Sequence, residues 1–242
     1  METTYSKEGK TKEVNIGGCI KSCLIDSNVI AYWVISKNIN EKIFDKLDLP
    51  DGFKNGYNDR YNNSLSFIDA VIDETFKDKF DFITYDFNIF EVAKAIKDEI
   101  RTLYLFKKGV PISRWTTTRN NERFEEEIIS EIYAGYSTAQ DTLFIKNKIN
   151  LQNIPFSINS KTYANFYEFY SYILFRIPDL STQDALIISG CYIDKIDYLI
   201  SEDRRLRDIW KAFVKENKII KDGVDLEIKS PGDPMFKVAK HH

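Results

Sequence analysis

Carboxylates are the side chains of this sequence whose types and spacing could carry chemistry. The 242 residues hold only two histidines, His241 and His242, at the very end, where they read as the remnant of a purification tag. This scarcity argues against Ser-His-Asp and Cys-His catalysis, a histidine general base and histidine-rich zinc sites. The three cysteines are too few for a disulfide framework or a four-ligand zinc site. Hydrolytic chemistry would therefore fall to acidic residues that hold a hard cation through oxygen.

Two apolar runs typical of buried strands end in acidic residues. The first run ends at Asp26, and the second leads into residues 201–203. Asp184 opens the helix directly before the second run, and Glu91 lies early in the helix after the strand candidate DFITYDF. Ligands of open α/β sheets bind at the carboxyl ends of the strands, so we expect these acids to lie together. Because such a cluster repels itself unless a cation shields it, the sequence predicts a Mg²⁺ or Mn²⁺ centre. The expected catalytic and metal-binding residues are Asp26, Glu91, Asp184 and Asp203.

The order of these acids resembles that of the PIN-domain nucleases. The resemblance covers residues 20–106 and 178–232, and the 19 residues from Asp184 to Asp203 fit one helix plus one strand. The matching pattern is Asp26-x-Asn28, Glu91 on a helix, Asp184 opening a helix, and Ser201-x-Asp203 after a strand.

This resemblance implies a metal-dependent endoribonuclease that cuts single-stranded or structured RNA, with DNA as the alternative substrate of a related branch. It also implies that Asn28, Ser201 and Glu202 form the outer shell around the metal. Two departures stand out: 93 residues separate Glu91 from Asp184, and Tyr85 stands where many relatives carry a small hydroxyl residue.

Asp26, at the end of an apolar strand, has few structural explanations, but Glu91 and Asp184 each have one. Glu91 could pair on its helix with Lys94, and Asp184 is the third residue of a capping box that begins at Ser181. Asn28 and Ser201 could act as helix caps.

Strand and helix patterns alternate along the chain. They predict an α/β fold in which helices flank both faces of a mostly parallel central sheet of about four or five strands. We expect a single domain over residues 1–242, with a loose tail at 1–13, a loop at 50–63 and a helical insertion at 107–178. The segment KIIKDGVDLEIKSPG predicts a short strand, an Asp-Gly turn and an edge strand.

The net charge of −3 does not announce a nucleic-acid-binding protein, but cations gather in one stretch, 107–119, that contains no acid. We expect these cations to bind RNA phosphates away from the cleavage point, a solvated surface being the alternative. In the aromatic helix near residue 170, Phe169, Tyr172 and Arg176 are candidates for base stacking. The predicted phosphate-binding residues are Lys107, Lys108, Arg114 and Arg119.

Two other functions stay open at this point. One is a phosphatase of the haloacid-dehalogenase type with Asp26 as nucleophile, although Asn28 replaces its expected second aspartate. The other is an RNA-binding PIN module with a degenerate site. The sequence contains no signal-peptide core and no membrane span, which predicts a cytoplasmic protein. A homodimer and a protein partner or inhibitor are further alternatives.

Overall fold

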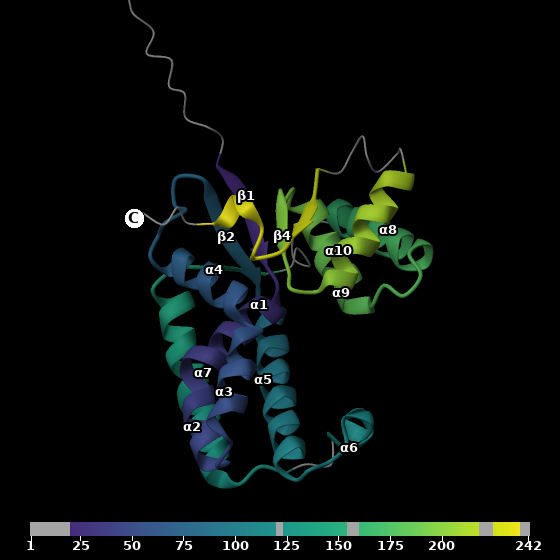
Figure 1. Cartoon of the computed structure of the whole chain (residues 1–242). Coiled ribbons are helices and arrows are strands. Elements are labelled where there is room, and N and C mark those ends of the chain that lie inside the picture. The colour runs from purple at the N-terminus through teal and green to yellow at the C-terminus, as the bar shows by residue number, and fades with distance from the viewer. Residues whose placement is uncertain (1–19, 120–122, 154–159, 218–224, 238–242) are drawn as a thin grey trace, which may run out of the picture.

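A computed structural model describes residues 20–119, 123–153, 160–217 and 225–237, and the side chains of 160–164 are outside this description. Five parallel strands form one sheet, which confirms the predicted α/β class (Figure 1). The strand order is β3-β2-β1-β4-β5. The strands are β1 (Lys21–Ile25), β2 (Phe80–Tyr85), β3 (Asn150–Gln152), β4 (Tyr198–Ile200) and β5 (Glu227–Lys229).

The strand order reverses next to β1. From β1 the chain adds β2 and then β3 on one side, and afterwards β4 and β5 on the other side. Ile25, the last residue of β1, pairs with Ile200, the last residue of β4, so both strands end at the same level. The gap between the ends of β1 and β4 is thus the topological switch point, where open α/β sheets bind their ligands.

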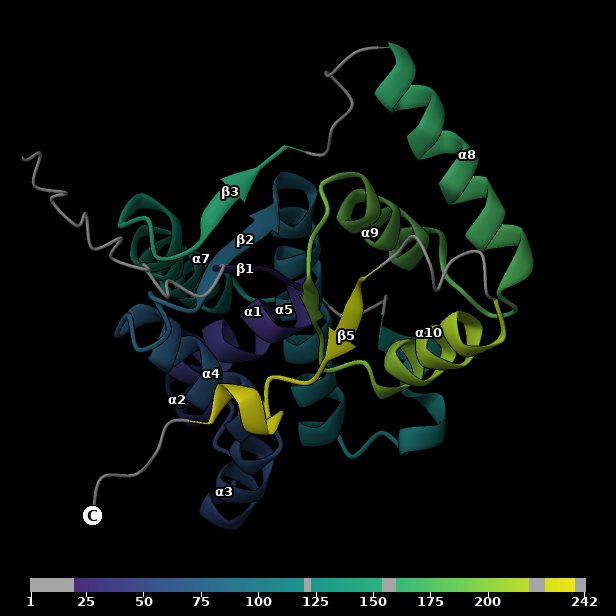
Figure 2. The same cartoon turned by 90° about the horizontal axis from the view of Figure 1, so that it is seen from above.

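Helices cover both faces of the sheet (Figure 2). Successive side chains of a strand point to opposite faces, and β1 follows this rule: Cys23 and Ile25 belong to one hydrophobic core, and Leu24 to another. The first core includes α1, α4 and α5, and the second includes α8, α9 and α10. The α-helices are α1 (Ser27–Val34), α2 (Asn40–Lys46), α3 (Asp51–Asp59), α4 (Asn62–Ile72), α5 (Asp86–Lys107), α6 (Trp115–Thr118), α7 (Glu126–Gln140), α8 (Ser160–Arg176), α9 (Thr182–Ile193) and α10 (Arg204–Glu216).

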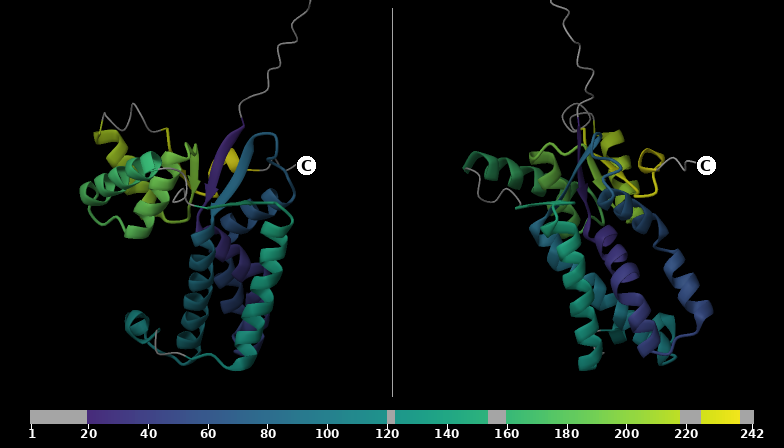
Figure 3. Two further views of the ribbon diagram at one scale, coloured as in Figure 1. Left: turned by 180° about the vertical axis from the view of Figure 1, so that it is seen from behind. Right: turned by 90° about the vertical axis from the view of Figure 1, so that its left-hand side faces the viewer.

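Several helices extend beyond the carboxyl end of the sheet as a bundle. Helix α1 continues through the π-helical turn Ile35–Ile39 into α2, and α3, α5 and α7 lie beside them (Figure 3). One face of the 22-residue helix α5 is apolar, and Val92, Ile96 and Ile100 on this face are all buried. The helix ends at Lys107, and Gly109 follows with a φ of 66°, a conformation that favours glycine.

The predicted loop at 50–63 is wrong, because residues 51–59 form α3 and α4 begins at Asn62. Glycines and asparagines make this segment look like a loop, yet its aromatic residues pack into the first core. The rings of Tyr57 and Phe44 meet edge to face at 5.4 Å, and Tyr57 and Tyr61 are buried. Tertiary packing of these rings offsets the weak helix propensity of Gly52 and Gly56.

The segment 107–178, predicted as a helical insertion, contains α6, α7, β3 and α8. It contributes α7 to the bundle, α8 to the other face, and β3 to the sheet edge, which was not predicted. The predicted tail at 1–13, the short strand at 218–220 and His241–His242 lie outside the described residues. The predicted edge strand near residue 227 is present as β5. In the described ranges, no helix has the length and apolar character needed to cross a membrane.

Helix α9 approaches the end of β2 very closely at one glycine. A Cβ atom on Gly190 would lie 2.7 Å from a ring carbon of Tyr85, so only glycine allows this contact. Tyr85 itself is fully buried, and its hydroxyl donates a 2.7 Å hydrogen bond to Asp194 at the end of α9. The unusual residue Tyr85 is therefore part of the packing that positions α9.

Candidate active site

Asp26 directly follows β1 and is buried, with 4% of its surface exposed. Its Oδ1 atom accepts hydrogen bonds from the backbone N–H of Ser27 at 2.7 Å and from the Ser27 hydroxyl. Its Oδ2 atom accepts from the Asn28 amide at 2.8 Å and from the Ser201 hydroxyl at 2.7 Å. Burial raises the pKa of Asp26 to about 6; the Ser201 hydrogen bond opposes this shift, and the Asp184 carboxylate adds to it.

Of the three predicted outer-shell residues, Asn28 and Ser201 bond the Asp26 carboxylate directly. Glu202 reaches the group only through its backbone N–H, and its carboxylate accepts a hydrogen bond from Ser64 on α4. Asn28 accepts a hydrogen bond from the backbone N–H of Glu202, and Ser201 is fully buried against Asp26. The Ser201 hydroxyl oxygen also accepts the backbone N–H of Asp203. These bonds fasten the end of β1 to the end of β4 across the switch point.

Three aspartates, Asp26, Asp184 and Asp203, form what we call the acidic group. The charge of Asp184 acts on Asp26, and the charge of Asp203 acts on Asp184. Burial raises the pKa of Asp184, and the nearby carboxylate of Asp203 raises it further, while the Ser181 hydrogen bond and Arg205 oppose the shift. Both aspartates also serve helix ends. The Ser181 hydroxyl caps α9 and donates to Asp184 at 2.7 Å, which confirms the predicted cap, and Asp203 caps α10 by accepting the N–H of Leu206.

Glu91 lies on the opposite wall, on α5. Its Oε1 atom accepts a 2.5 Å hydrogen bond from Gln183, the residue before Asp184. Lys94 is 3.9 Å from its Oε2 atom, so the structural partner considered from the sequence is present as well. Glu91 therefore joins α5 to the start of α9, beside the coupled aspartates.

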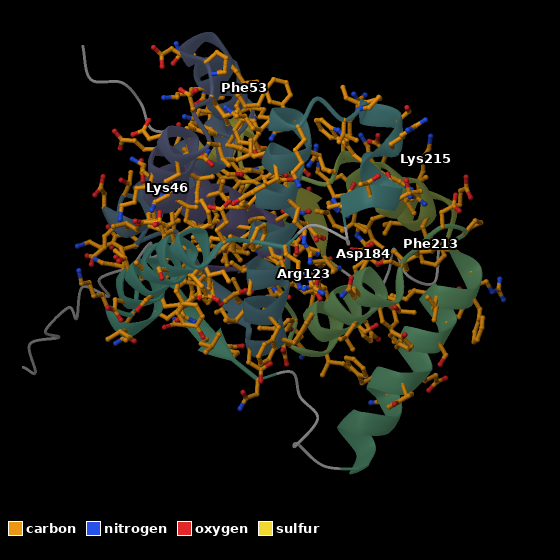
Figure 4. All side chains as sticks on the ribbon, turned by 90° about the horizontal axis from the view of Figure 1, so that it is seen from below. Lys46, Phe53, Arg123, Asp184, Phe213 and Lys215 are labelled. Atoms are coloured by element: carbon orange, nitrogen blue, oxygen red, sulfur yellow. The ribbon has the colours of Figure 1, made fainter. Side chains whose placement is uncertain are left out.

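Seen from below, the side where the strands end, Asp184 lies near the middle of the molecule (Figure 4). Lys46 and Phe53 lie on one side of it, and Phe213 and Lys215 lie on the other. Asp184 thus lies between the bundle and the helices of the second core.

The side chains suit a hard divalent cation chemically, because they offer carboxylate, amide and hydroxyl oxygens. A cation would also relieve the repulsion between carboxylates, which adds to the effect of burial on the pKa values of Asp26 and Asp184. In the described part of the chain, however, no three acidic, cysteine or histidine side chains converge closely enough to form a metal site in this conformation. Asp26 is held by its hydrogen bonds, and Asp184 is turned to Ser181.

Sequence patterns did not single out two buried residues that support Asp26. Thr84 donates to the carbonyl oxygen of Ile25 at 2.9 Å, and Asn88 donates to the same oxygen and to Thr84. Both are fully buried, and the Oδ1 atom of Asn88 has no hydrogen-bond partner in the described structure. Both are polar residues within apolar patterns, Thr84 in a strand and Asn88 in a helix. The sequence contains no sign that they bond the Ile25 carbonyl oxygen next to Asp26.

The predicted phosphate-binding cations lie at the end of α5, where Lys107 and Lys108 stand, and at the two ends of α6, where Arg114 and Arg119 stand. Lys107 pairs with Asp48 at 3.7 Å and Arg119 pairs with Asp98 at 3.5 Å, so other elements supply acids that the segment itself lacks. Lys108 and Arg114 have exposed side chains.

The base-stacking candidates of α8 pack mainly within the protein. Phe169 stacks on Tyr192 with ring centroids 3.9 Å apart, and Tyr172 packs on Phe213. Arg176 lies over the ring of Tyr172. Residues of α8 with more exposed rings are Phe175 and Tyr167.

We expect Asp184→Asn to lower metal-dependent cleavage more than a hundredfold while changing the free energy of unfolding by only about 0.3–1 kcal/mol, the value of a helix N-terminal interaction. The amide can still accept from Ser181, and the repulsion from Asp203 disappears. Thermal melting and cleavage rate, measured on the same preparation, separate the two roles. A large loss of melting temperature with preserved cleavage would mean that Asp184 serves only the cap.

The fold and site together define an all-parallel α/β protein with an acidic group at its switch point. In comparisons with family models, curated proteins and solved structures, no match to this chain was found.

Proposed function

We propose that this protein is a Mg²⁺- or Mn²⁺-dependent endoribonuclease of the PIN-domain type, with DNA as the alternative substrate. The observation that carries the proposal is the coupling of three aspartates, Asp26, Asp184 and Asp203, at the switch point of a parallel sheet. Burial raises the pKa values of Asp26 and Asp184, and the neighbouring carboxylates, Asp184 and Asp203 respectively, raise them further. Buried carboxylates placed in this way are costly in the protein without a cation, and this cost is explained if a metal binds there.

In this proposal, Asp26, Asp184 and Asp203 hold the metal, and Glu91 acts as a further ligand or orients water. A bound divalent ion would activate water and neutralise the charge that develops on a phosphodiester during in-line attack. Ser201 and Asn28 hold the Asp26 carboxylate in one orientation. Release of Glu91 from Gln183 and of Asp184 from Ser181 would free oxygens for the ion.

The phosphatase alternative has less support from the geometry. It needs an acid two residues after the nucleophile, and Asn28 instead uses its amide to bind Asp26 and to accept from Glu202. The degenerate RNA-binding module remains the second candidate, because it would keep the same fold.

The direct test is cleavage of an end-labelled single-stranded RNA by the purified chain with Mg²⁺, Mn²⁺, or EDTA. We expect internal cuts with either metal and none with EDTA. The DNA strand of the same sequence reports on the preference between nucleic acids. RNA binding without cleavage under all metals would favour the degenerate module, and trapping of a phosphorylated Asp26 would favour the phosphatase.

The cation prediction is tested by salt dependence. Replacing Lys107, Lys108, Arg114 and Arg119 with glutamine should weaken RNA binding and flatten its dependence on salt, by about 0.7 in the slope for each phosphate that is no longer neutralised. Metal affinity should not change. A matched control removes four lysines of α2 and α10, namely Lys42, Lys46, Lys211 and Lys215. Equal slopes in the two variants would mean that the cations of the 107–119 segment bind no RNA phosphates and form only a solvated surface.

A further inference from the structure

A second group of polar side chains lies between α1, α4 and α5. Arg60, which follows α3, lies over the ring of Tyr57, with 3.8 Å from the guanidinium carbon to the ring centroid. Its distance to the Tyr61 centroid is 4.8 Å. The Oε1 atom of Glu99 on α5 accepts hydrogen bonds from Arg60 and from the hydroxyls of Tyr57 and Tyr61. These contacts fix the guanidinium group, while 48% of the Arg60 side chain stays exposed.

Tyr32 on α1 connects this group with the acidic site. Its ring packs on Tyr61 with centroids 4.6 Å apart and is only partly buried. In the described structure, its hydroxyl makes no hydrogen bond to the protein. Burial raises the pKa of this hydroxyl, and the charges of Glu99, Glu202 and Arg60, and more weakly of Asp26, act on it as well. Tyr32 therefore packs on the ring cluster that holds Arg60, and it lies on α1, the helix that Asp26 caps.

Helix α4 provides the physical connection between the two groups. Ser64, one helical turn after Arg60, is fully buried and donates a 2.8 Å hydrogen bond to Glu202. The backbone N–H of Glu202 in turn bonds Asn28, the neighbour of Asp26. A continuous run of hydrogen bonds thus extends from the Asp26 carboxylate to the start of the helix next to Arg60.

We propose that Tyr32 and Arg60 form a phosphate-binding subsite that holds a phosphodiester of the nucleic acid next to the one that is cut. This inference rests on the proposed function. A guanidinium group has five N–H donors in a planar fork that matches phosphate, and Glu99 occupies only part of that fork. The Tyr32 hydroxyl adds a neutral donor. The tyrosine rings and Glu99 orient the arginine in advance, which lowers the entropy lost on binding.

The experiment measures binding of fluorescent single-stranded RNA and DNA decamers to the full chain across a salt series. All variants share an Asp26→Asn background, so that cleavage does not interfere. Arg60→Gln should weaken binding at least tenfold and reduce the salt slope by about 0.7, the value of one neutralised phosphate. Tyr32→Phe should weaken binding about fivefold with an unchanged slope, because it removes a neutral donor and keeps the ring. Lys46→Gln, which removes an ion-paired charge of α2, is the matched control and should bind as the background does.

Arg60→Lys is a second variant, used because Arg60→Gln could weaken binding simply by disturbing the fold. It keeps the charge but lacks the planar fork, so we expect intermediate affinity and a slope like that of the background. Binding by Tyr32→Phe and Arg60→Lys that equals the background would overturn the subsite, even if Asp26→Asn abolishes cleavage. Conversely, cleavage by Asp26→Asn at the wild-type rate would overturn the proposed function, whatever the binding series gives.

Discussion

Asp26→Asn is expected to abolish Mg²⁺- or Mn²⁺-dependent RNA cleavage while leaving the fold intact. The substitution removes a charge at nearly constant volume from the carboxylate that joins the ends of β1 and β4. Metal affinity should therefore fall far more than stability. Cleavage of labelled RNA and titration with Mn²⁺ measure the two effects. If the variant cleaves RNA at the wild-type rate, Asp26 is not part of the active site.

The same substitution should stabilise the metal-free protein at neutral pH. The folded-state pKa of Asp26, about 6, lies above the ordinary value of 3.8, so its proton is held more tightly in the folded protein. The stabilisation is complete below about pH 4 and is lost as the pH rises through 6. On the order of 3 kcal/mol of stability is lost in this way.

At pH 7.5 we expect Asp26→Asn to restore about 1–2 kcal/mol of the lost free energy of unfolding. The gain is smaller than the loss, because the N–H₂ group of the new amide faces hydrogen-bond donors such as Asn28. The measurement is the difference in unfolding free energy between variant and wild type, taken in EDTA at pH 5 and pH 7.5. The advantage of the variant should grow with pH. Mn²⁺ should reverse the order by stabilising only the wild type.

Gly190→Ala is expected to have the largest effect on the fold. The added methyl group would lie 2.7 Å from a ring carbon and 2.8 Å from the hydroxyl oxygen of Tyr85, which is fully buried. The contact must push α9 away from β2, at a cost of about 1–3 kcal/mol or more. Because α9 begins at the residues around Asp184, cleavage should fall as well. Urea unfolding and RNA cleavage measure both effects.

A double variant distinguishes this clash from a general weakness of α9. Tyr85→Leu removes the ring that the methyl group would meet, so Tyr85→Leu/Gly190→Ala should be less destabilised than the sum of the single changes. Gly52→Ala is the control, because nothing lies near its Cβ position. Additive effects in the double variant would mean that the clash with Tyr85 is not the cause.

Strand-end acids allowed much of the site to be predicted from the sequence. An acid after a buried strand has few structural roles, and two such strands in a parallel sheet end at one edge. The structure accordingly couples Asp26, Asp184 and Asp203. Glu91 was harder to place, since its bond to Gln183 depends on how α5 lies against α9.

Other features of the fold have no recognisable pattern in the sequence. The strand β3 has only three residues, all exposed, and its pairing with β2 alone defines it. Helix α3 has the composition of a loop and depends on Tyr57 and Phe53 packing against Phe44. Tyr85 looked like a departure from a family pattern, whereas Gly190, 105 residues later, explains it.

The separation into two hydrophobic cores has a consequence for local unfolding. The cores lie on opposite faces of the sheet, so we expect one to be able to loosen while most of the other stays packed. Local unfolding would then occur in two units, α8–α10 and the bundle, with different amide-exchange rates. Asp26 and Glu91 belong to the bundle side, while Asp184 begins a helix of the second unit. An ion shared by these acids would tie the two units together, so the cooperativity of unfolding itself would depend on the ligand.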